Sequence, residues 1–346
     1  MINEELKEVL ANRKNELFSE LIDEINDEYI TDIEWDGYNL WITKLGEGCK
    51  ISSKKLSDRY VDNLSIKLAN IMEVPFNRIH PILEANTKTL RISIWHESRS
   101  SKKSVAIRKI PEKLRFGHDS LIESNYISEE LLNLLENSVI AHLSTVIGGQ
   151  PHAGKTELLK YLSTFIPAYE KVGVYEDNQE IHYRKLNPNK KCVEFYVDNK
   201  VSYADIIRAG LRHNIDWILL SESRGDEVLD LLNSLSTGAN CMTTMHLDDI
   251  RDMPDRMFNM LRNSGVSDRF INNIYKYIDL VVLVECDKYE KRKVTQVGFL
   301  NRDKNNECVV IYDNGEIINK NLPEKVKFKF LRYGITDPFK KYKRED

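Results

Sequence analysis

The chain has 346 residues, 41% of them hydrophobic and 30% charged, a composition typical of packed globular domains and a length that predicts two of them. Its formal net charge of −4 provides no overall attraction for nucleic acid or for a membrane surface, and no apolar run is long enough to span a bilayer. The first residues lack the apolar core of a signal peptide and the five cysteines form no C-x-x-C pair, so we expect a reducing cytoplasm and no structural zinc.

The first third of the chain predicts a small α+β domain. Apolar residues recur at helical spacing in two segments and alternate with polar residues in others. The dipeptide Asp36-Gly37 interrupts the first alternating segment, as expected for a hairpin turn. The expected elements are a helix over 1–28, a hairpin over 29–43, a helix over 54–72, and strands over 89–94 and 104–110.

A basic stretch and a polar stretch close this domain. Seven basic residues and one acidic residue lie between Arg99 and Arg115, which usually marks a solvated basic face. The alternative is that Arg108, together with Arg91, points at phosphate groups bound elsewhere. The polar, glycine-containing segment that follows predicts a linker. The predicted division is an amino-terminal domain over 1–115, a linker over 116–127 and a second domain over 128–346.

After the linker, helix and strand patterns alternate. Ser128 is the predicted N-cap of the first helix. Alternation of this kind predicts an α/β domain with a mainly parallel sheet covered by helices, and ligands bind such sheets at the carboxyl ends of the strands. The expected strands are 172–175, 193–197, 217–220 and 241–245, and the expected helices are 131–139, 203–213, 226–235 and 250–261.

One stretch of this domain has the phosphate-binding loop pattern G-x-x-x-x-G-K-T, from Gly149 to Thr156. Glycines let the backbone amides wrap around phosphate oxygens, Lys155 brings a positive charge, and the Thr156 hydroxyl is a ligand for Mg²⁺. An apolar, β-branched run precedes the loop and a helical pattern follows it, which is the context that the motif requires. The predicted nucleotide contacts are Gly149, Gln150, Pro151, His152, Ala153, Gly154, Lys155, Thr156 and Glu157.

Charged side chains follow the neighbouring predicted strands. Glu176 and Asp177 end one strand, Glu222 and Arg224 follow another, and His246 ends a third. Phosphoryl transfer to water needs a positioned acid to orient the nucleophile and cations to stabilise charge on the departing group. Any one of these residues could be a turn cap or a surface charge. Together, on the same edge as a phosphate-binding loop, they predict hydrolysis of a nucleoside triphosphate.

The order of these motifs resembles that of the hexameric ATPases of bacterial type II and type IV secretion, including those of pili and conjugation. The likeness covers most of the chain, and the absence of a four-cysteine zinc module favours the conjugation-like or tight-adherence-pilus-like branch. Residues 149–156 resemble the family's Walker A loop, 174–180 its acidic "Asp box", 218–227 its Walker B motif and 237–246 its "His box", and Arg91 and Val105-Ala-Ile-Arg108 resemble the end of its amino-terminal domain.

The resemblance implies a RecA-like P-loop motor domain that follows the α+β domain. It implies an ATPase that converts ATP and water to ADP and phosphate with Mg²⁺, working as a homohexameric ring. The implied location is cytoplasmic, with peripheral association at the inner face of the membrane. The implied partners are inner-membrane components of a secretion or pilus machine, and no direct binding to nucleic acid is expected.

The resemblance also assigns roles to the candidate residues. Glu222 would orient the attacking water and Glu176 would belong to the Mg²⁺ or water shell, two assignments that could be exchanged. The other assignments are Lys155 and the loop amides on the phosphates, Thr156 on Mg²⁺, His246 as a sensor of the γ-phosphate, and Arg91 and Arg108 closing onto phosphate from the first domain.

Some positions depart from the family pattern. Ser221 replaces a glycine before the Walker B glutamate, Glu157 stands where a second Thr or Ser is common, and residues 150–152 form an unusual loop interior. These departures leave open a switch or assembly factor that binds ATP and barely hydrolyses it, and a RecA-like DNA motor is a third reading. The basic, aromatic segment 320–346 predicts either a membrane or partner contact or a tail packed by its own aromatic residues.

Overall fold

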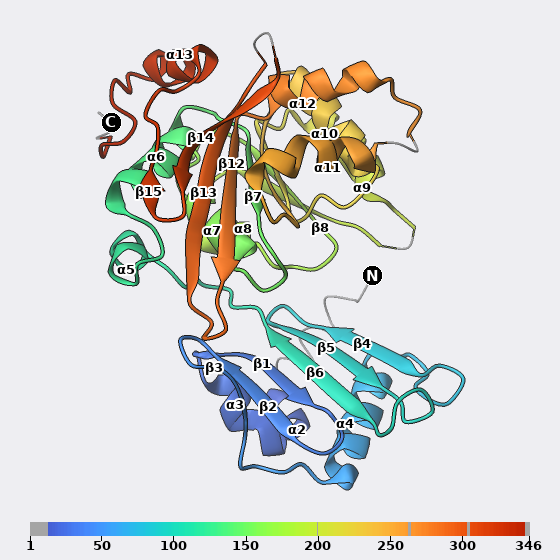
Figure 1. Cartoon of the computed structure of the whole chain (residues 1–346). Coiled ribbons are helices and arrows are strands. Elements are labelled where there is room, and N and C mark those ends of the chain that lie inside the picture. The colour runs from blue at the N-terminus through green and yellow to red at the C-terminus, as the bar shows by residue number, and fades with distance from the viewer. Residues whose placement is uncertain (1–12, 199, 262–263, 303–304, 343–346) are drawn as a thin grey trace. The chain divides into compact units, whose positions relative to one another are not determined.

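The computed structural model in Figure 1 describes residues 13–198, 200–261, 264–302 and 305–342. The chain divides into two compact units. The first unit contains Met1–Glu112 and Asp287–Lys291, and the second contains Lys113–Cys286 and Arg292–Asp346. Each unit has its own hydrophobic core and is described separately below.

The first unit is built on an antiparallel sheet of six strands in the order β3-β2-β1-β6-β5-β4. The side chains of one face, with Ile33, Ile92 and Ile107 among them, pack against the helices and form the core. The strands are β1 (Ile30–Trp35), β2 (Leu40–Lys44), β3 (Gly48–Ile51), β4 (Ile82–Asn86), β5 (Leu90–Trp95) and β6 (Ser104–Lys109), and the helices are α2 (Lys14–Leu17), α3 (Ile22–Asn26) and α4 (Asp58–Ile71).

The helix expected over 1–28 is not continuous. Residues 1–12 lie outside the described residues, and the rest forms two short α-helices separated by a 3₁₀ turn at Ser19–Leu21. The backbone leaves helical geometry at Phe18 and Leu21, whose side chains are both buried. Packing into the core therefore overrides the helical periodicity here. The helix expected over 54–72 forms as α4, with the Ser57 hydroxyl accepting a hydrogen bond from the backbone N–H of Tyr60.

The second unit is built on a nine-stranded sheet in the order β15-β14-β13-β12-β7-β11-β10-β8-β9. The six strands β12, β7, β11, β10, β8 and β9 pair with their neighbours in parallel. The strands β13, β14 and β15 add antiparallel pairs at one edge. Helices cover both faces, so the unit has two hydrophobic cores. The predicted fold class, an α/β domain with a mainly parallel sheet behind a small α+β domain, is confirmed.

The elements of the second unit follow the predicted alternation of helices and strands. The strands are β7 (Thr145–Gly148), β8 (Val172–Glu176), β9 (Cys192–Tyr196), β10 (Trp217–Leu220), β11 (Asn240–Met245), β12 (Leu280–Cys286), β13 (Arg292–Asn301), β14 (Glu307–Asp313) and β15 (Glu316–Ile317). The α-helices are α5 (His118–Glu123), α6 (Glu129–Ile140), α7 (Lys155–Ser163), α8 (Tyr183–Leu186), α9 (Tyr203–Gly210), α10 (Glu227–Ser236), α11 (Met253–Met260), α12 (Ile271–Tyr277) and α13 (Glu324–Arg332).

The segment expected as a linker, 116–127, is packed into the second unit. It contains α5, and its residues Leu121, Tyr126 and Ile127 are buried in that unit's core. The backbone N–H of Val294 donates to the carbonyl of Tyr126 at 2.8 Å. The segment is polar overall, and its three buried apolar residues do not stand out in the sequence. Because they pack into the second unit, the division between the units falls earlier, after Glu112.

The carboxyl-terminal segment is also packed on the second unit. Val326, Phe330 and Phe339 are buried in the core, and Lys325 and Lys329 of α13 each lie 2.7 Å from a carboxylate oxygen of the fully buried Asp279. This arrangement agrees with the reading of a tail held by its aromatic residues. Among the described residues, the helices are too short or too polar to cross a membrane.

Candidate nucleotide-binding site

The phosphate-binding loop connects β7, which is completely buried, to α7. Gly149 has φ of +149° and Gly154 has φ of +93°, conformations that L-residues rarely adopt. A Cβ atom on Gly149 would lie 2.2 Å from the carbonyl oxygen of Val284. The two glycines of the motif are thus required by the loop's path, and the amides at the start of α7 are available to an anion.

Lys155 lies within the curve of this loop. Its side chain is largely buried, and its Nζ donates at 2.9 Å to the carbonyl oxygens of both Gly149 and Gln150. Nδ1 of His246 lies 3.4 Å from the same ammonium group. Lys155 is thus placed at the loop, and its predicted contact with phosphate groups stays a prediction.

The rest of the loop is held from outside by residues that sequence reasoning did not select. The Gln150 amide donates to a carboxylate oxygen of Asp248. Nε of Arg292 donates at 3.1 Å to the carbonyl oxygen of His152, and a Cβ on Gly154 would lie 2.8 Å from the Arg292 side chain. Pro151 is exposed and Ala153 is buried, completing the predicted loop positions.

Glu157, the last of the predicted contacts, is turned to another partner. Its Oε1 lies 3.0 Å from Nζ of Lys160, one helical turn later, and the Lys160 side chain is fully buried. One oxygen of this carboxylate is thus engaged within α7, and the other, Oε2, is buried without a hydrogen-bond partner among the described residues. The predicted contact of Glu157 with a nucleotide stays a prediction.

Glu180, rather than Glu176, lies beside the candidate Mg²⁺ ligand Thr156. The Thr156 hydroxyl donates to Oε2 of Glu180 at 3.5 Å. Glu176 is only 2% exposed, and its Oε1 accepts the backbone N–H groups of Glu180 at 2.9 Å and Ile181 at 2.8 Å. Burial raises the pKa of Glu176 to about 8. Glu176 therefore anchors the loop after β8, and this loop carries Glu180 toward Thr156.

A set of charged side chains crosses the carboxyl edge of the sheet from β7 to β8. Oε1 of Glu222 lies 2.9 Å from Nε2 of His246, and the other oxygen of Glu222 lies 2.6 Å from Arg224. Arg224 also lies 3.2 Å from Asp177. Lys155 adjoins His246, so successive contacts link five side chains in the order Lys155, His246, Glu222, Arg224 and Asp177. We refer to these five side chains as the carboxyl-edge cluster.

The register of the sheet explains why these residues meet. In the parallel pairs, Val146 of β7 lies beside Thr243 of β11, which lies beside Leu220 of β10, which lies beside Tyr175 of β8. The four strands therefore end within two residues of one another, and the residues that follow them share one edge. Asp177 and Arg224 were among the strand-end charges noted in the sequence but were assigned no individual role, and Glu180 was visible only as part of its motif.

Arg91 and Arg108 lie on the first unit, directly opposite each other on β5 and β6. Nε of Arg108 donates to Oδ1 of Asp32 at 3.0 Å, and Asp32 is opposite Arg108 on β1. Like charges placed opposite each other on a sheet destabilise it unless a counter-charge is near. Asp32 supplies part of that counter-charge. The role of the two arginines toward phosphate remains a prediction.

The residues present fit a nucleotide with Mg²⁺ in three respects. The glycines permit close approach of the backbone, Lys155 is directed into the loop, and a hydroxyl with a neighbouring carboxylate is the donor set that suits a hard cation.

Comparison with known proteins adds independent findings. Residues 76–319 match the model of a family described as type II/IV secretion system protein. An uncharacterized protein of Bacillus anthracis is 27% identical over 233 residues, covering 67% of this chain and 53% of that protein. The type IV secretion system protein PtlH of Bordetella pertussis is 27% identical over 172 residues, covering 46% of this chain and 50% of PtlH.

The ATPase DotB of Legionella pneumophila has a similar solved structure, with a TM-score of 0.60 and 15% identity over 92% of this chain and 88% of the DotB chain. At this identity the likeness shows a shared fold. The chain spans about half the length of the curated relatives that it matches.

Proposed function

The chain belongs to the type II/IV secretion system protein family, and from this premise we propose that it is an ATP-hydrolysing motor of a bacterial secretion, conjugation or pilus machine. The observation that carries the proposal is the carboxyl-edge cluster. In this cluster the Glu222 carboxylate lies between Arg224 and His246. His246 in turn contacts Lys155 of the loop. Hydrolysis of a phosphoanhydride needs an acid that orients water and cations that stabilise charge on the phosphate, and this cluster contains both kinds of group.

We propose the following roles for the chain's own groups. Lys155 and the amides at the start of α7 would bind phosphate oxygens, and the Thr156 hydroxyl and the neighbouring Glu180 carboxylate would hold Mg²⁺. Bound Mg²⁺ would neutralise charge on those oxygens. Glu222 orients the attacking water, and His246 links Glu222 to Lys155.

The structure changes the role that we propose for Glu176. A carboxylate in the shell of a cation must reach that cation, whereas the oxygen of Glu176 is used by two backbone amides in a buried loop. Glu176 is therefore a positioning residue, and the metal-shell role passes to Glu180. The two glutamates first considered as exchangeable, Glu176 and Glu222, are not equivalent.

We retain three further parts of the sequence prediction as proposals. Arg91 and Arg108 act on phosphate when the first unit closes, the active form is a homohexameric ring, and the ring works with inner-membrane components at the cytoplasmic face. The family membership and the names of the relatives support them, since PtlH is named for a type IV secretion system.

A weakly hydrolysing switch is the second candidate. It is favoured by one observation, that Glu222 is bound on both oxygens, by His246 and by Arg224, and must be released before it can orient water. Turnover separates the two functions, because a switch would bind ATP with little release of phosphate.

The test is steady-state phosphate release from Mg-ATP. The wild-type protein should release phosphate, and Lys155→Ala should abolish release, because it removes the loop's side-chain cation. Lys171→Ala is the matched control, since Lys171, which directly precedes β8, is a partly exposed lysine whose Nζ donates to the carbonyl of His213. Equal activity in Lys155→Ala and the wild type would contradict the site, and nucleotide binding without release by the wild type would favour the switch.

A further inference from the structure

The first unit has a sheet face that its helices do not cover. Alternate residues of each strand belong to this face, and the register places Trp41, Glu34, Ala106 and Ser93 in one row across β2, β1, β6 and β5. Trp95 lies on the same face two residues after Ser93 in β5, opposite Ser104 of β6. The small side chains of Ala106, Ser93 and Ser104 leave room between the two tryptophans.

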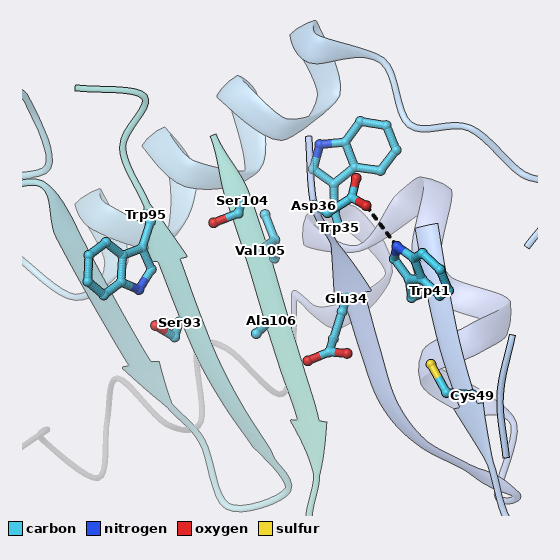
Figure 2. Close-up of a pocket in the computed structure, with 10 residues that line it drawn as sticks. All are labelled: Glu34, Trp35, Asp36, Trp41, Cys49, Ser93, Trp95, Ser104, Val105 and Ala106. Carbon is cyan, nitrogen blue, oxygen red and sulfur yellow. Dashed lines mark hydrogen bonds between the residues drawn. The ribbon is translucent and has the colours of Figure 1, made fainter. Parts of the chain in front are cut away.

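A pocket of about 480 Å³ occupies this room. Figure 2 shows Trp95 on one side, Trp41 on the other and the Glu34 carboxylate between them. Trp95 is 43% exposed, although tryptophan is usually buried in a folded protein. An exposed aromatic side chain beside a pocket is typical of a surface that binds a ligand or a partner protein.

The charges of the pocket have one sign. Its lining contains two carboxylates, Glu34 and Asp36, and no basic side chain. Asp36 is already used, because it accepts hydrogen bonds from the Trp41 indole and from the backbone N–H groups of Tyr38 and Asn39. Within the part of the chain that the structure describes, no hydrogen-bond or ion-pair partner engages the Glu34 carboxylate.

Two arginines, Arg91 and Arg108, and one carboxylate, Asp32, lie further along the same face. Arg108 and Asp32 lie two residues beyond Ala106 and Glu34, a separation of about 7 Å along extended strands. The acidic, aromatic part of the face is therefore distinct from the two arginines discussed above. A ligand that carried a negative charge would favour the arginine end, and one that carried a positive charge would favour Glu34.

We propose that this pocket binds an arginine or lysine side chain carried on a short apolar segment of a partner protein. The cation would pair with Glu34 and lie against an indole face, since a guanidinium or ammonium group is attracted to the face of tryptophan. The apolar neighbours of the cation would cover Trp95 and Ile82, which is 46% exposed and opposite Trp95 on β4. Arginine fits better than lysine, because its planar group both stacks and pairs.

Tryptophan fluorescence of the full chain can report binding. The chain has four tryptophans, of which Trp35 and Trp217 are buried, at 5% and 0% exposure. Trp35, Trp41 and Trp95 all line the pocket, but the Trp35 side chain is buried, so Trp41 and Trp95 should dominate any change. The probe is the capped peptide Ac-Ala-Leu-Arg-Leu-Ala-NH₂, and the control peptide has glutamate in place of arginine. We expect a saturable change with the arginine peptide, with Kd of about 1 mM or tighter, and none with the control.

Two substitutions on the same row separate the pocket from general surface charge. Glu34→Gln should weaken binding of the arginine peptide by about tenfold or more, because it removes the counter-charge. Glu84→Gln removes the same charge from an exposed residue of β4, opposite Ser93 and outside the pocket, and should leave Kd unchanged. Neither residue belongs to the proposed nucleotide site, so phosphate release should stay at the wild-type rate in both variants.

Three results would overturn the proposal. The first is the absence of a saturable change with the arginine peptide up to about 10 mM, well above the expected Kd. The second is equal affinity of Glu34→Gln and the wild type for the peptide. The third is a loss of self-association in Glu34→Gln, measured by sedimentation, which would assign this face to a second copy of the chain.

Discussion

The second unit contains two histidine–carboxylate pairs, His246–Glu222 and His142–Glu170, whose contacts are similar and whose surroundings differ. At the carboxyl edge, Nε2 of His246 lies 2.9 Å from Glu222. Just after the end of α6, Nε2 of His142 lies 2.7 Å from Oε1 of Glu170. The contact itself is almost the same in the two pairs, so the contact cannot distinguish a working pair from a structural one.

The surroundings of the two pairs differ. The His246 side chain is 41% exposed, and Lys155 and Arg224 adjoin its pair. The His142 side chain is 16% exposed and its ring stacks on Tyr333, with ring centroids 4.6 Å apart. The second oxygen of Glu170 accepts from the buried Trp217 indole at 2.7 Å. A largely buried pair packed beside aromatic rings holds the fold together, whereas a more exposed pair beside two cations at a strand edge can serve chemistry.

Removing the carboxylate charge should separate the pairs most widely. Glu222→Gln should lower steady-state phosphate release by about 10²–10³-fold, because the amide cannot orient water as the anion does. Glu170→Gln should keep release within about threefold of the wild type, since its contacts lie in the core. Release by both variants is measured with saturating Mg-ATP. Similar losses in the two variants would mean that the pairs are not functionally different.

Removing the imidazole should reverse the ranking in stability. His142→Ala should lower the free energy of unfolding by about 2–4 kcal/mol, because it leaves a cavity between Tyr333 and Trp217 and frees the Glu170 carboxylate. His246→Ala should change it by less than about 0.5 kcal/mol. Urea denaturation followed by circular dichroism gives both values. An unchanged midpoint for His142→Ala would remove the structural assignment of that pair.

A third carboxylate, Glu176, sharpens the comparison through pH. Its folded-state pKa is raised from 4.5 to about 8 by burial, so between these values the folded protein holds a proton that the unfolded chain has lost. The stabilising contribution is full below the unfolded pKa and decreases as pH rises toward 8, by at most about 1.4 kcal/mol per pH unit. Glu176→Gln should remove this decrease. Denaturation midpoints of the two proteins compared at several pH values check it, and parallel pH curves would contradict the buried, protonated state.

The smallest effect is expected at the outer end of the carboxyl-edge cluster. Arg224 and Asp177 are 53% and 31% exposed, and exposed ion pairs contribute less than about 1 kcal/mol. Asp177→Asn should therefore reduce phosphate release by less than about fivefold, mainly by loosening Arg224 against Glu222. A loss as large as that of Glu222→Gln would move Asp177 from a supporting position to the reaction itself.

Local patterns were sufficient for much of the fold. The phosphate-binding loop, the parallel strands and the meeting of their polar ends follow from glycine positions and strand spacing, and the family match confirms the resemblance that these motifs suggest. Each of these features depends on residues that are close in sequence or on a general property of parallel sheets.

The proposed assignment of the metal-shell role to Glu180 instead of Glu176 could not be read from the same patterns. Both residues belong to the acidic segment after β8, and the choice between them depends on which carboxylate is buried and which N–H groups it accepts. The packed segment 116–127 and the interruption at Phe18 have a similar origin, because distant core residues decided the local conformation. Long-range burial is the information that a single sequence does not display.

The central claim is that Glu222 orients water while Lys155 and the loop bind phosphate. The most direct measurement is the identity of the nucleotide that remains bound to Glu222→Gln after incubation with Mg-ATP, determined by rapid gel filtration and chromatography of the released nucleotide. The account predicts that the bound nucleotide stays ATP, whereas the wild type under the same conditions carries ADP. Recovery of ADP from Glu222→Gln at the wild-type rate would contradict the claim.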